Sequence, residues 1–211
     1  LELVIVGEGE VVEDEGLQLR ENNRKVNIST LELKNKGTGE EKKLDWQSLD
    51  DKLKNILGKR IYFANTVERL QGTYDRLIAA GVSADKIIVL HNRMPRAWRA
   101  DAEKKAYDCF GKETQNGDWI LLTNQVAEAG LDISAPLVIS DPAPVDTLVQ
   151  RAGRCGRWFR KEETKGEFVV IKPKSEEIKK EMAIPYRINL VSAAINSIPT
   201  IQLTWKTEQA W

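Results

Sequence analysis

Residues 59–90, KRIYFANTVERLQGTYDRLIAAGVSADKIIVL, hold the pattern that decides the fold. Arg60–Ala64 is a short and almost wholly apolar run, which predicts a buried strand. Thr66–Ala80 predicts a helix that ends at Gly81, and Lys86–Leu90 predicts a second buried strand. A strand, a helix and another strand in this order make one unit of a parallel sheet.

The same alternation continues toward the C-terminus. Arg96–Phe110 predicts a helix, and another helix begins with Thr147–Arg151. Short apolar strands are predicted at Trp119–Leu122, Leu137–Ser140 and Phe168–Ile171. Such strands, alternating with helices, are typical of a parallel sheet that helices cover on both faces. We therefore predict an α/β fold whose functional residues lie at the carboxyl ends of the strands.

The flanking segments are less regular. The predicted elements here are strands at Leu1–Val6, Glu10–Val12 and Val26–Leu33, a helix at Asp45–Leu57 capped by Asp45, and a helix at Tyr186–Ile195. The strongly charged run Lys172–Lys180 precedes the last of these predicted helices. We predict a strand-rich leader or linker over residues 1–44, the main domain over 45–172 and a C-terminal extension or linker over 173–211. Since the chain does not begin with Met, we expect it to be a fragment of a longer protein.

Composition excludes several classes of protein. The chain has 211 residues, 41% of them hydrophobic and 30% charged, which is typical of a soluble domain with its own core. Its 32 basic and 32 acidic residues give no net charge, so charge neither favours nor excludes nucleic-acid binding. Two cysteines form no disulfide framework, one histidine excludes a histidine-rich metal site, and no apolar run could span a bilayer. We predict a cytoplasmic protein that binds no membrane and holds no metal through this chain.

The strongest chemical signal is Gln150-Arg151-Ala152-Gly153-Arg154-Cys155-Gly156-Arg157, called the octet below. Its arginines recur every third residue, so a turn of helix places their guanidinium groups on one side. Guanidinium groups suit both the grip on phosphate oxygens and the charge of a transferring phosphoryl group. A glycine inside a helix costs about 1 kcal/mol relative to Ala, so the two glycines need a structural reason.

The octet resembles motif VI of superfamily 2 helicases. Thr123–Asp132, which follows a predicted strand, resembles motif V of the same superfamily, and Asp141–Val149 runs directly into the octet. Together these segments resemble the CRISPR-associated helicase–nuclease of type I systems more than generic DEAD-box proteins. Asn65-Thr66-Val67 resembles the motif IV region of that family, and Leu90–Met94 resembles its L-H-S-R-F segment, from which Asn92 and Met94 depart.

The resemblance covers about residues 45–172 and implies the second, C-terminal RecA-like domain of such a helicase. By this resemblance, Arg154 and Arg157 are arginine fingers that reach the γ-phosphate of ATP, and Gln150 lies near the ATP or its attacking water. Gly130 and Asp132 would face the nucleotide ribose or the interdomain linkage. These residues form the predicted catalytic and ATP-binding set.

A second set is predicted to bind nucleic acid: Thr66, His91, Asn92, Arg93, Thr123 and Gln125. Hydroxyl and amide groups at strand ends and helix starts can hold phosphates, because a helix N-terminus favours an anion. Simpler alternatives stay open. Thr66 can be only the N-cap of its helix, and His91 only a polar residue at a strand end.

Two arginine or glutamate side chains keep two possible roles, and two tryptophans are expected to have no binding role. Arg151 either joins the other arginines or pairs with an acidic residue such as Asp146. Glu128 is either part of the site or a solvated carboxylate. Trp98 and Trp119 are expected to pack in the fold rather than to stack on bases.

Two motifs of a complete motor do not occur in the sequence. A phosphate-binding loop needs G-x-x-x-x-G-K-[ST], and magnesium binding needs D-E-x-[DH]. We expect a missing first lobe to bind most of ATP and Mg²⁺. One histidine is also too few for an HD nuclease. The fragment alone should neither hydrolyse ATP nor cut DNA.

The resemblance therefore implies one lobe of an ATP-dependent DNA helicase of type I CRISPR interference. Its implied partners are single-stranded DNA, the first RecA-like domain, an HD nuclease (fused or separate) and the RNA-guided surveillance complex. An RNA helicase or another superfamily 2 translocase stays open, because motifs that follow the backbone do not separate DNA from RNA. A non-catalytic, nucleic-acid-binding helicase-like module also stays open. A phosphate-binding α/β domain outside the family would need three ordered motifs by coincidence.

Overall fold

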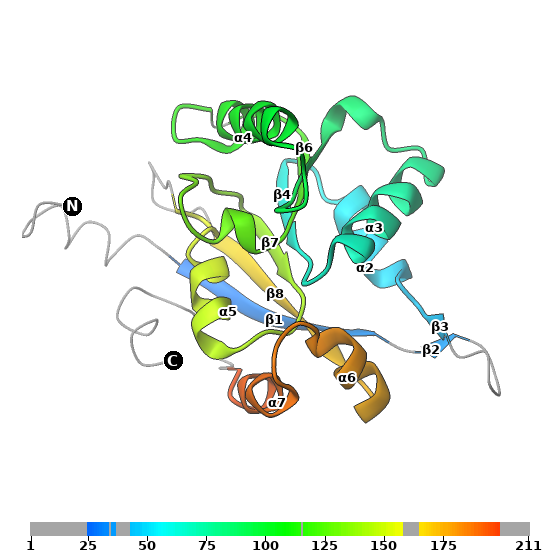
Figure 1. Cartoon of the computed structure of the whole chain (residues 1–211). Helices are drawn as coiled ribbons and strands as arrows, with labels where there is room; N and C mark the ends of the chain where they lie inside the picture. The colour runs from blue at the N-terminus through cyan, green and yellow to red at the C-terminus, as the bar shows by residue number, and fades with distance from the viewer. Residues whose placement is uncertain (1–24, 34, 37–42, 115, 158–164, 199–211) are drawn as a thin grey trace, which may run out of the picture.

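The computed structural model describes residues 25–33, 35–36, 43–114, 116–157 and 165–198 (Figure 1). Six parallel strands form one sheet in the order β1-β8-β7-β4-β6-β5. They are β1 (Lys25–Leu33), β4 (Lys59–Phe63), β5 (Ile87–Leu90), β6 (Trp119–Thr123), β7 (Leu137–Ser140) and β8 (Lys165–Pro173). Two short strands, β2 (Asn35–Lys36) and β3 (Lys43–Leu44), pair antiparallel outside this sheet.

Helices cover both faces of the sheet (Figure 1). One face carries α2 (Gln47–Asn55), α3 (Val67–Ala79) and α6 (Glu176–Ala183), and the other carries α4 (Arg96–Phe110), α5 (Val145–Ala152) and α7 (Ile188–Asn196). Leu53, Leu70 and Met182 belong to the first core, and Phe110, Leu148 and Ala194 to the second. The predicted α/β class, a parallel sheet flanked by helices on both faces, is confirmed.

Local signals set the helix boundaries. The Thr66 hydroxyl accepts the N–H of Arg69 at 3.3 Å and caps α3, while Gly81 takes a left-handed φ of +85° just beyond its end. The Asp45 carboxylate accepts the N–H of Gln47 at 3.1 Å at the start of α2, although the N-cap is Trp46 and not Asp45 as predicted. Both helices therefore begin within two residues of the predicted positions.

The sheet aligns the carboxyl ends of its central strands. Phe63, the last residue of β4, is in register with Thr123 of β6 and Ser140 of β7, and Leu90 of β5 is in register with Thr123. The segments that follow these four strands therefore meet along one edge, called the carboxyl edge below. Two short 3₁₀ turns, η1 (Ala84–Lys86) and η2 (Gln125–Ala127), complete the connections.

The structure differs from the predicted organisation at both flanks. β1 was placed in a leader, yet it pairs with β8 along nine positions, and Val26 and Leu33 are fully buried. Alternating apolar residues predict a strand but not the sheet that it joins, so a main domain that begins at residue 45 leaves out one strand of this sheet. A helix that was not predicted, α6, begins at Glu176 and includes the C-terminal part of the charged run Lys172–Lys180.

The strands predicted at Leu1–Val6 and Glu10–Val12 lie outside the described residues. Within the described part of the chain, every helix is too short or too polar to cross a membrane.

Candidate functional site

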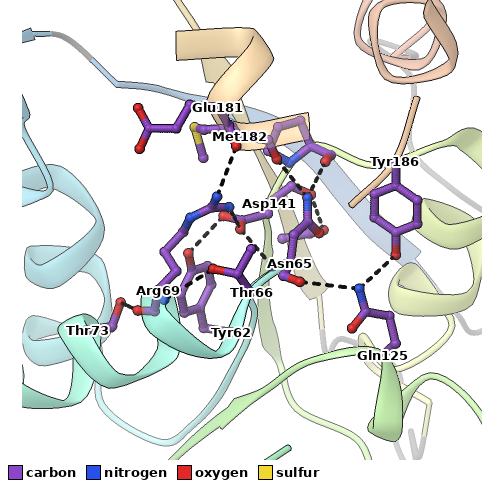
Figure 2. Close-up of polar contacts among 12 residues, drawn as sticks. Tyr62, Asn65, Thr66, Arg69, Thr73, Gln125, Asp141, Glu181, Met182 and Tyr186 are labelled. Carbon is purple, nitrogen blue, oxygen red and sulfur yellow. Dashed lines mark hydrogen bonds and ion pairs between the residues drawn. The ribbon is translucent and has the colours of Figure 1, made fainter. Parts of the chain in front are cut away.

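A buried carboxylate organises the carboxyl edge. Asp141, directly after β7, is fully buried and accepts hydrogen bonds from the Tyr62 hydroxyl and the Asn65 backbone N–H, each at 2.8 Å. Arg69 of α3 forms an ion pair with the same carboxylate (Figure 2). Burial, followed by the charge of Asp141, raises the pKa of Tyr62 well above its ordinary value, so the phenol stays protonated and donates. The pairing with Arg69 compensates a charge that would otherwise be costly to bury.

Asn65, directly after β4, joins this carboxylate to three other segments. Its Nδ2 donates to the carbonyl oxygens of Pro142 and Met182, each at 2.9 Å, and its Oδ1 accepts from Arg151 at 3.1 Å. The turn after β7, the end of α6 and the octet are therefore held by one amide side chain. Figure 2 shows the side of this network that includes Met182 and Asp141. A buried network of this kind fixes a single arrangement when all its members are satisfied.

Arg151 is the largest fully buried side chain among the described residues. Its guanidinium pairs with Glu128 at 2.8 Å, donates to the Ser140 hydroxyl at 2.9 Å and lies 5.4 Å from the centre of the Phe63 ring. The suggested pairing with Asp146 is wrong, since Asp146 is exposed on α5. The alternative of a solvated Glu128 is also wrong, because its side chain is only 11% exposed and pairs with a buried cation.

The end of the octet lies away from the carboxyl edge. α5 runs back along β7, and residues 154–156 meet the chain just before that strand begins. The Ala135 N–H donates to the Arg154 carbonyl at 3.1 Å, and the Gly156 N–H donates to the Ala135 carbonyl at 2.9 Å. Gly156 has a φ of +59°, a conformation that glycine adopts at little cost. This turn explains one of the two glycines without any neighbouring domain.

The side chains of Arg154 and Arg157, which lie in and directly after this turn, differ in exposure and in hydrogen bonding. Arg154 is 8% exposed and donates from Nη2 to the Glu128 carbonyl at 2.6 Å, while its buried Nε has no hydrogen-bond partner among the described residues. The side chain of Arg157 is 42% exposed, with Nε 3.4 Å from a carboxylate oxygen of Asp132. Burial, and then the nearby charge of Arg157, lower the pKa of Arg154, and Asp132 opposes this effect.

This arrangement fits a phosphate. Two guanidinium groups stand close enough to repel each other, and one of them has a buried donor nitrogen that no acceptor in the described part of the chain satisfies. An anion with several oxygens would relieve both costs, because planar guanidinium groups bind phosphate oxygens well. Of the other residues predicted for ATP, Asp132 contacts Arg157, Gly130 takes a φ of +84° on the surface, and Gln150 is exposed on α5.

Three of the six residues predicted to bind nucleic acid lie at the carboxyl edge: Thr66, His91 and Arg93. Thr66 is the N-cap described above, so its simpler interpretation is confirmed, and its phosphate contact stays a prediction. His91 is partly buried, and its Nδ1 has no hydrogen-bond partner among the described residues. Burial, followed by the charge of Arg93, lowers the pKa of His91. Arg93 is exposed and pairs with Glu68 at 2.7 Å.

The remaining three predicted residues lie around η2. Thr123 is fully buried, so its hydroxyl is not presented at the surface. Asn124 donates to the Oδ1 of Asn92 at 2.9 Å, which ties the loop after β5 to the segment after β6. Gln125 donates from Nε2 to the Asn65 carbonyl at 3.4 Å and to the Tyr186 hydroxyl at 3.2 Å (Figure 2). Five of the six residues thus lie at accessible parts of one edge.

The two tryptophans behave differently. Trp119 is partly buried, and the ammonium groups of Lys86 and Lys105 lie 4.7 and 5.7 Å from the centre of its ring. Packing is therefore confirmed for Trp119. It is wrong for Trp98, which is 67% exposed, because α4 buries residues only near its C-terminal end and Trp98 lies in its first turn.

Sequence reasoning missed Arg69 and Tyr186. Arg69 neutralises Asp141, and Tyr186 accepts from both Gln125 and Arg151. Both contacts join segments far apart in the chain, and no local pattern signals them. The capping motif at Thr66 predicts where α3 begins, but it does not predict where the Arg69 side chain ends.

Comparison with known proteins gives one consistent result. Residues 57–160 match the model of the family described as CRISPR-associated nuclease/helicase Cas3, C-terminal. The CRISPR-associated endonuclease/helicase Cas3 of Escherichia coli strain K12 is 34% identical over 98 residues, which are 46% of this chain and 11% of that protein. The crystal structure of T. fusca Cas3 with AMPPNP is 29% identical with a TM-score of 0.61, covering 73% of this chain and 18% of that one.

The C-terminal domain of the DEAD-box protein Dbp5 resembles the chain in fold alone. It has 18% identity and a TM-score of 0.51, and the similarity covers 90% of this chain and 97% of that domain. The chain spans less than one fifth of either Cas3 protein, at 11% and 18% of their lengths. The family match contains the octet, the segment that resembles motif V and the carboxyl edge from Asn65 to Asp141. The chain is therefore similar to the CRISPR-associated nuclease/helicase Cas3 family over residues 57–160, and within that similarity it corresponds to the second, C-terminal RecA-like domain of a superfamily 2 helicase.

Proposed function

We propose that this domain is the second motor lobe of an ATP-dependent DNA helicase or translocase that unwinds target DNA in type I CRISPR interference. One observation carries the proposal. Arg154 has a buried donor nitrogen with no partner among the described residues, beside the partly exposed guanidinium of Arg157. This is the arrangement expected of an incomplete phosphate site that a partner lobe completes.

The chemistry needs little from this lobe except charge. ATP, bound with Mg²⁺ mainly by the first RecA-like domain, supplies the phosphoryl group that is transferred to water. Arg157 is exposed enough to reach across an interdomain cleft, and Arg154 holds a second positive charge behind it. Their guanidinium groups stabilise negative charge that develops on the phosphoryl oxygens. Gln150 would orient the attacking water, and Gly130 and Asp132 would line the ribose side.

The carboxyl edge supplies the nucleic-acid contacts. Thr66 and the start of α3 offer a hydroxyl and backbone N–H groups to one phosphate, and Arg93 offers an exposed charge. Asn92 and Gln125 offer amides, and His91 a ring at the same edge. Thr123 is buried, and its hydroxyl donates to the Asn124 carbonyl, so it would act through Asn124 rather than by direct contact. These groups follow a sugar–phosphate backbone and read no base, as a translocase requires.

The proposed partners follow from the same assignment. They are single-stranded DNA, the first RecA-like domain, an HD nuclease (fused or separate) and the RNA-guided surveillance complex, all in the cytoplasm. Alone, the 211-residue chain should neither hydrolyse ATP nor cut DNA, because it carries neither a phosphate-binding loop nor a magnesium motif.

The test is the ATPase activity of the full-length protein with and without single-stranded DNA or RNA, measured for the wild type and for Arg157→Ala. DNA should stimulate the wild type strongly, and the variant should lose about 10³-fold or more in rate, as arginine fingers do. Arg96→Ala is the matched control, since Arg96 is an exposed arginine on α4. Its rate should stay within about twofold of the wild type.

Other outcomes would change the assignment. Stimulation by RNA alone would favour an RNA helicase of the same superfamily. No ATPase activity, or an unchanged rate in Arg157→Ala, would leave a non-catalytic binding module in which the octet has only a structural role.

A further inference from the structure

Tyr186 lies outside the segment that matches the family, between α6 and α7. Its ring packs against the small apolar cluster of Ala183, Val191 and Ile195, and its backbone N–H donates to the Ala183 carbonyl at 2.7 Å. These contacts fix the ring on the C-terminal helices. The ring is held by these contacts, and its hydroxyl points toward Gln125 in the network at the carboxyl edge (Figure 2).

The hydroxyl oxygen accepts two hydrogen bonds from different parts of the motor lobe. Gln125 Nε2, at the start of η2, donates to it at 3.2 Å, and Arg151 Nη2, in the octet, donates at 3.3 Å. A phenol oxygen has acceptor capacity for both donors. One atom thus links a residue proposed to contact the strand to the helix that ends at the proposed arginine fingers.

Asn65 also connects Gln125 with Arg151, by a route separate from Tyr186. Its backbone carbonyl accepts from Gln125, its side-chain oxygen accepts from Arg151, and its amide donates to the Met182 carbonyl at the end of α6. The α6–α7 segment therefore holds the network at two points, through Met182 and through Tyr186. If Gln125 moves when a strand binds, the Tyr186 hydroxyl and the Arg151 guanidinium must rearrange with it.

We propose that Tyr186 is a positioning residue that couples strand binding at the carboxyl edge to the arginines at the end of α5. This rests on the function proposed above. The contribution of Tyr186 is to the response, since its hydroxyl contacts Gln125 and Arg151. Without its hydroxyl, Arg151 keeps Glu128, Ser140 and Asn65, so the fold and the phosphate site persist. The link to Gln125 through one shared oxygen atom is lost, and only the longer one through the backbone and side chain of Asn65 remains.

The experiment compares the full-length wild type, Tyr186→Phe and Tyr107→Phe. Tyr107 is the matched control, because it is a 54% exposed tyrosine on α4. For each protein, the ATPase rate is measured without nucleic acid and with saturating single-stranded DNA, and thermal unfolding is recorded. Tyr186→Phe should keep the basal rate and the melting temperature, while the ratio of stimulated to basal rate falls about fivefold or more, in the range of ordinary coupling between sites. Tyr107→Phe should match the wild type in all three quantities.

The outcomes separate this inference from the function on which it rests. A wild type that DNA does not stimulate overturns the proposed function, and the coupling with it. If DNA stimulates the wild type and Arg157→Ala loses activity, but Tyr186→Phe matches Tyr107→Phe, the coupling alone is overturned. Equal loss of basal and stimulated rates in Tyr186→Phe, or a lowered melting temperature with an unchanged ratio, shows a purely structural hydroxyl and also overturns the inference.

Discussion

At the scale of single residues, the stability of the site depends on how one buried cation is compensated. Arg151 is fully buried, and among the residues that the structure describes its one carboxylate partner is Glu128. Removing one partner of a buried ion pair leaves the other charge uncompensated in a poorly solvating environment. The hydroxyl and carbonyl groups around Arg151 are neutral, so they solvate its charge only in part.

We therefore expect Glu128→Ala to lower the free energy of unfolding of the 211-residue chain by about 3 kcal/mol or more, as for other broken buried pairs. Denaturant unfolding followed by circular dichroism measures this quantity. Asp146→Ala, an exposed carboxylate on α5, is the control and should cost less than about 1 kcal/mol. Equal losses in the two variants would mean that Arg151 does not depend on Glu128.

Sequence reasoning could find that Arg151 needs an acid, but not which one. It suggested Asp146, a neighbour in the chain, yet residues five apart on a helix do not face each other. Glu128 precedes Arg151 by 23 residues, and only the return of α5 along β7 brings them together. The capping role of Thr66 was predictable for the opposite reason, since its partner lies within one turn of helix.

At the scale of elements, the sequence predicts what is local and apolar. α4 and β7 have the predicted bounds, because each is a clear run of one periodicity. α6 was missed because its buried apolar residues, Ile178, Met182 and Ala183, occur in a segment rich in lysines and glutamates. The place of β1 in the sheet could not be predicted, since pairing along nine positions with β8 joins residues more than 130 apart.

The pairing of β1 gives an element-scale prediction. A chain of residues 45–211 should be far less stable than one of residues 25–211, because it exposes the edge of β8 and loses the burial of Val26 and Leu33. Those two side chains alone account for about 3–6 kcal/mol. Thermal unfolding and size-exclusion chromatography of the two chains would test this, and the shorter one should melt much lower or aggregate. Melting temperatures within a few degrees of each other would show that β1 is not needed for the sheet.

At the scale of the whole molecule, the predicted site residues divide between two surfaces. Thr66, His91, Asn92, Arg93 and Gln125 lie at the carboxyl edge, whereas Arg154, Arg157 and Asp132 lie past the end of α5. The motifs predicted both sets of residues. They could not predict the buried network of Asn65, Arg151 and Tyr186 that lies between the two surfaces. The proposed motor function needs the groups that bind the strand and the groups that bind phosphate to be separate yet connected.

This separation leads to a prediction about salt. For the full-length protein, each phosphate contact to a single strand contributes about 0.7 to the slope of log affinity against log salt concentration. Arg93→Ala should lower the magnitude of the slope by about that amount, and Arg157→Ala should leave it at the wild-type value. Fluorescence anisotropy with a labelled single strand, at several salt concentrations, measures the slope.

Glu68→Ala is the informative companion variant. Glu68 pairs with Arg93 at 2.7 Å and therefore competes with phosphate for the same guanidinium. Its removal should leave Arg93 free and make binding at least as tight as in the wild type, although an exposed ion pair was lost. If Glu68→Ala instead weakens binding as Arg93→Ala does, the pair acts as one unit that orients the loop after β5. If Arg157→Ala changes the salt slope as much as Arg93→Ala, the strand contacts both surfaces, and the division between them is wrong.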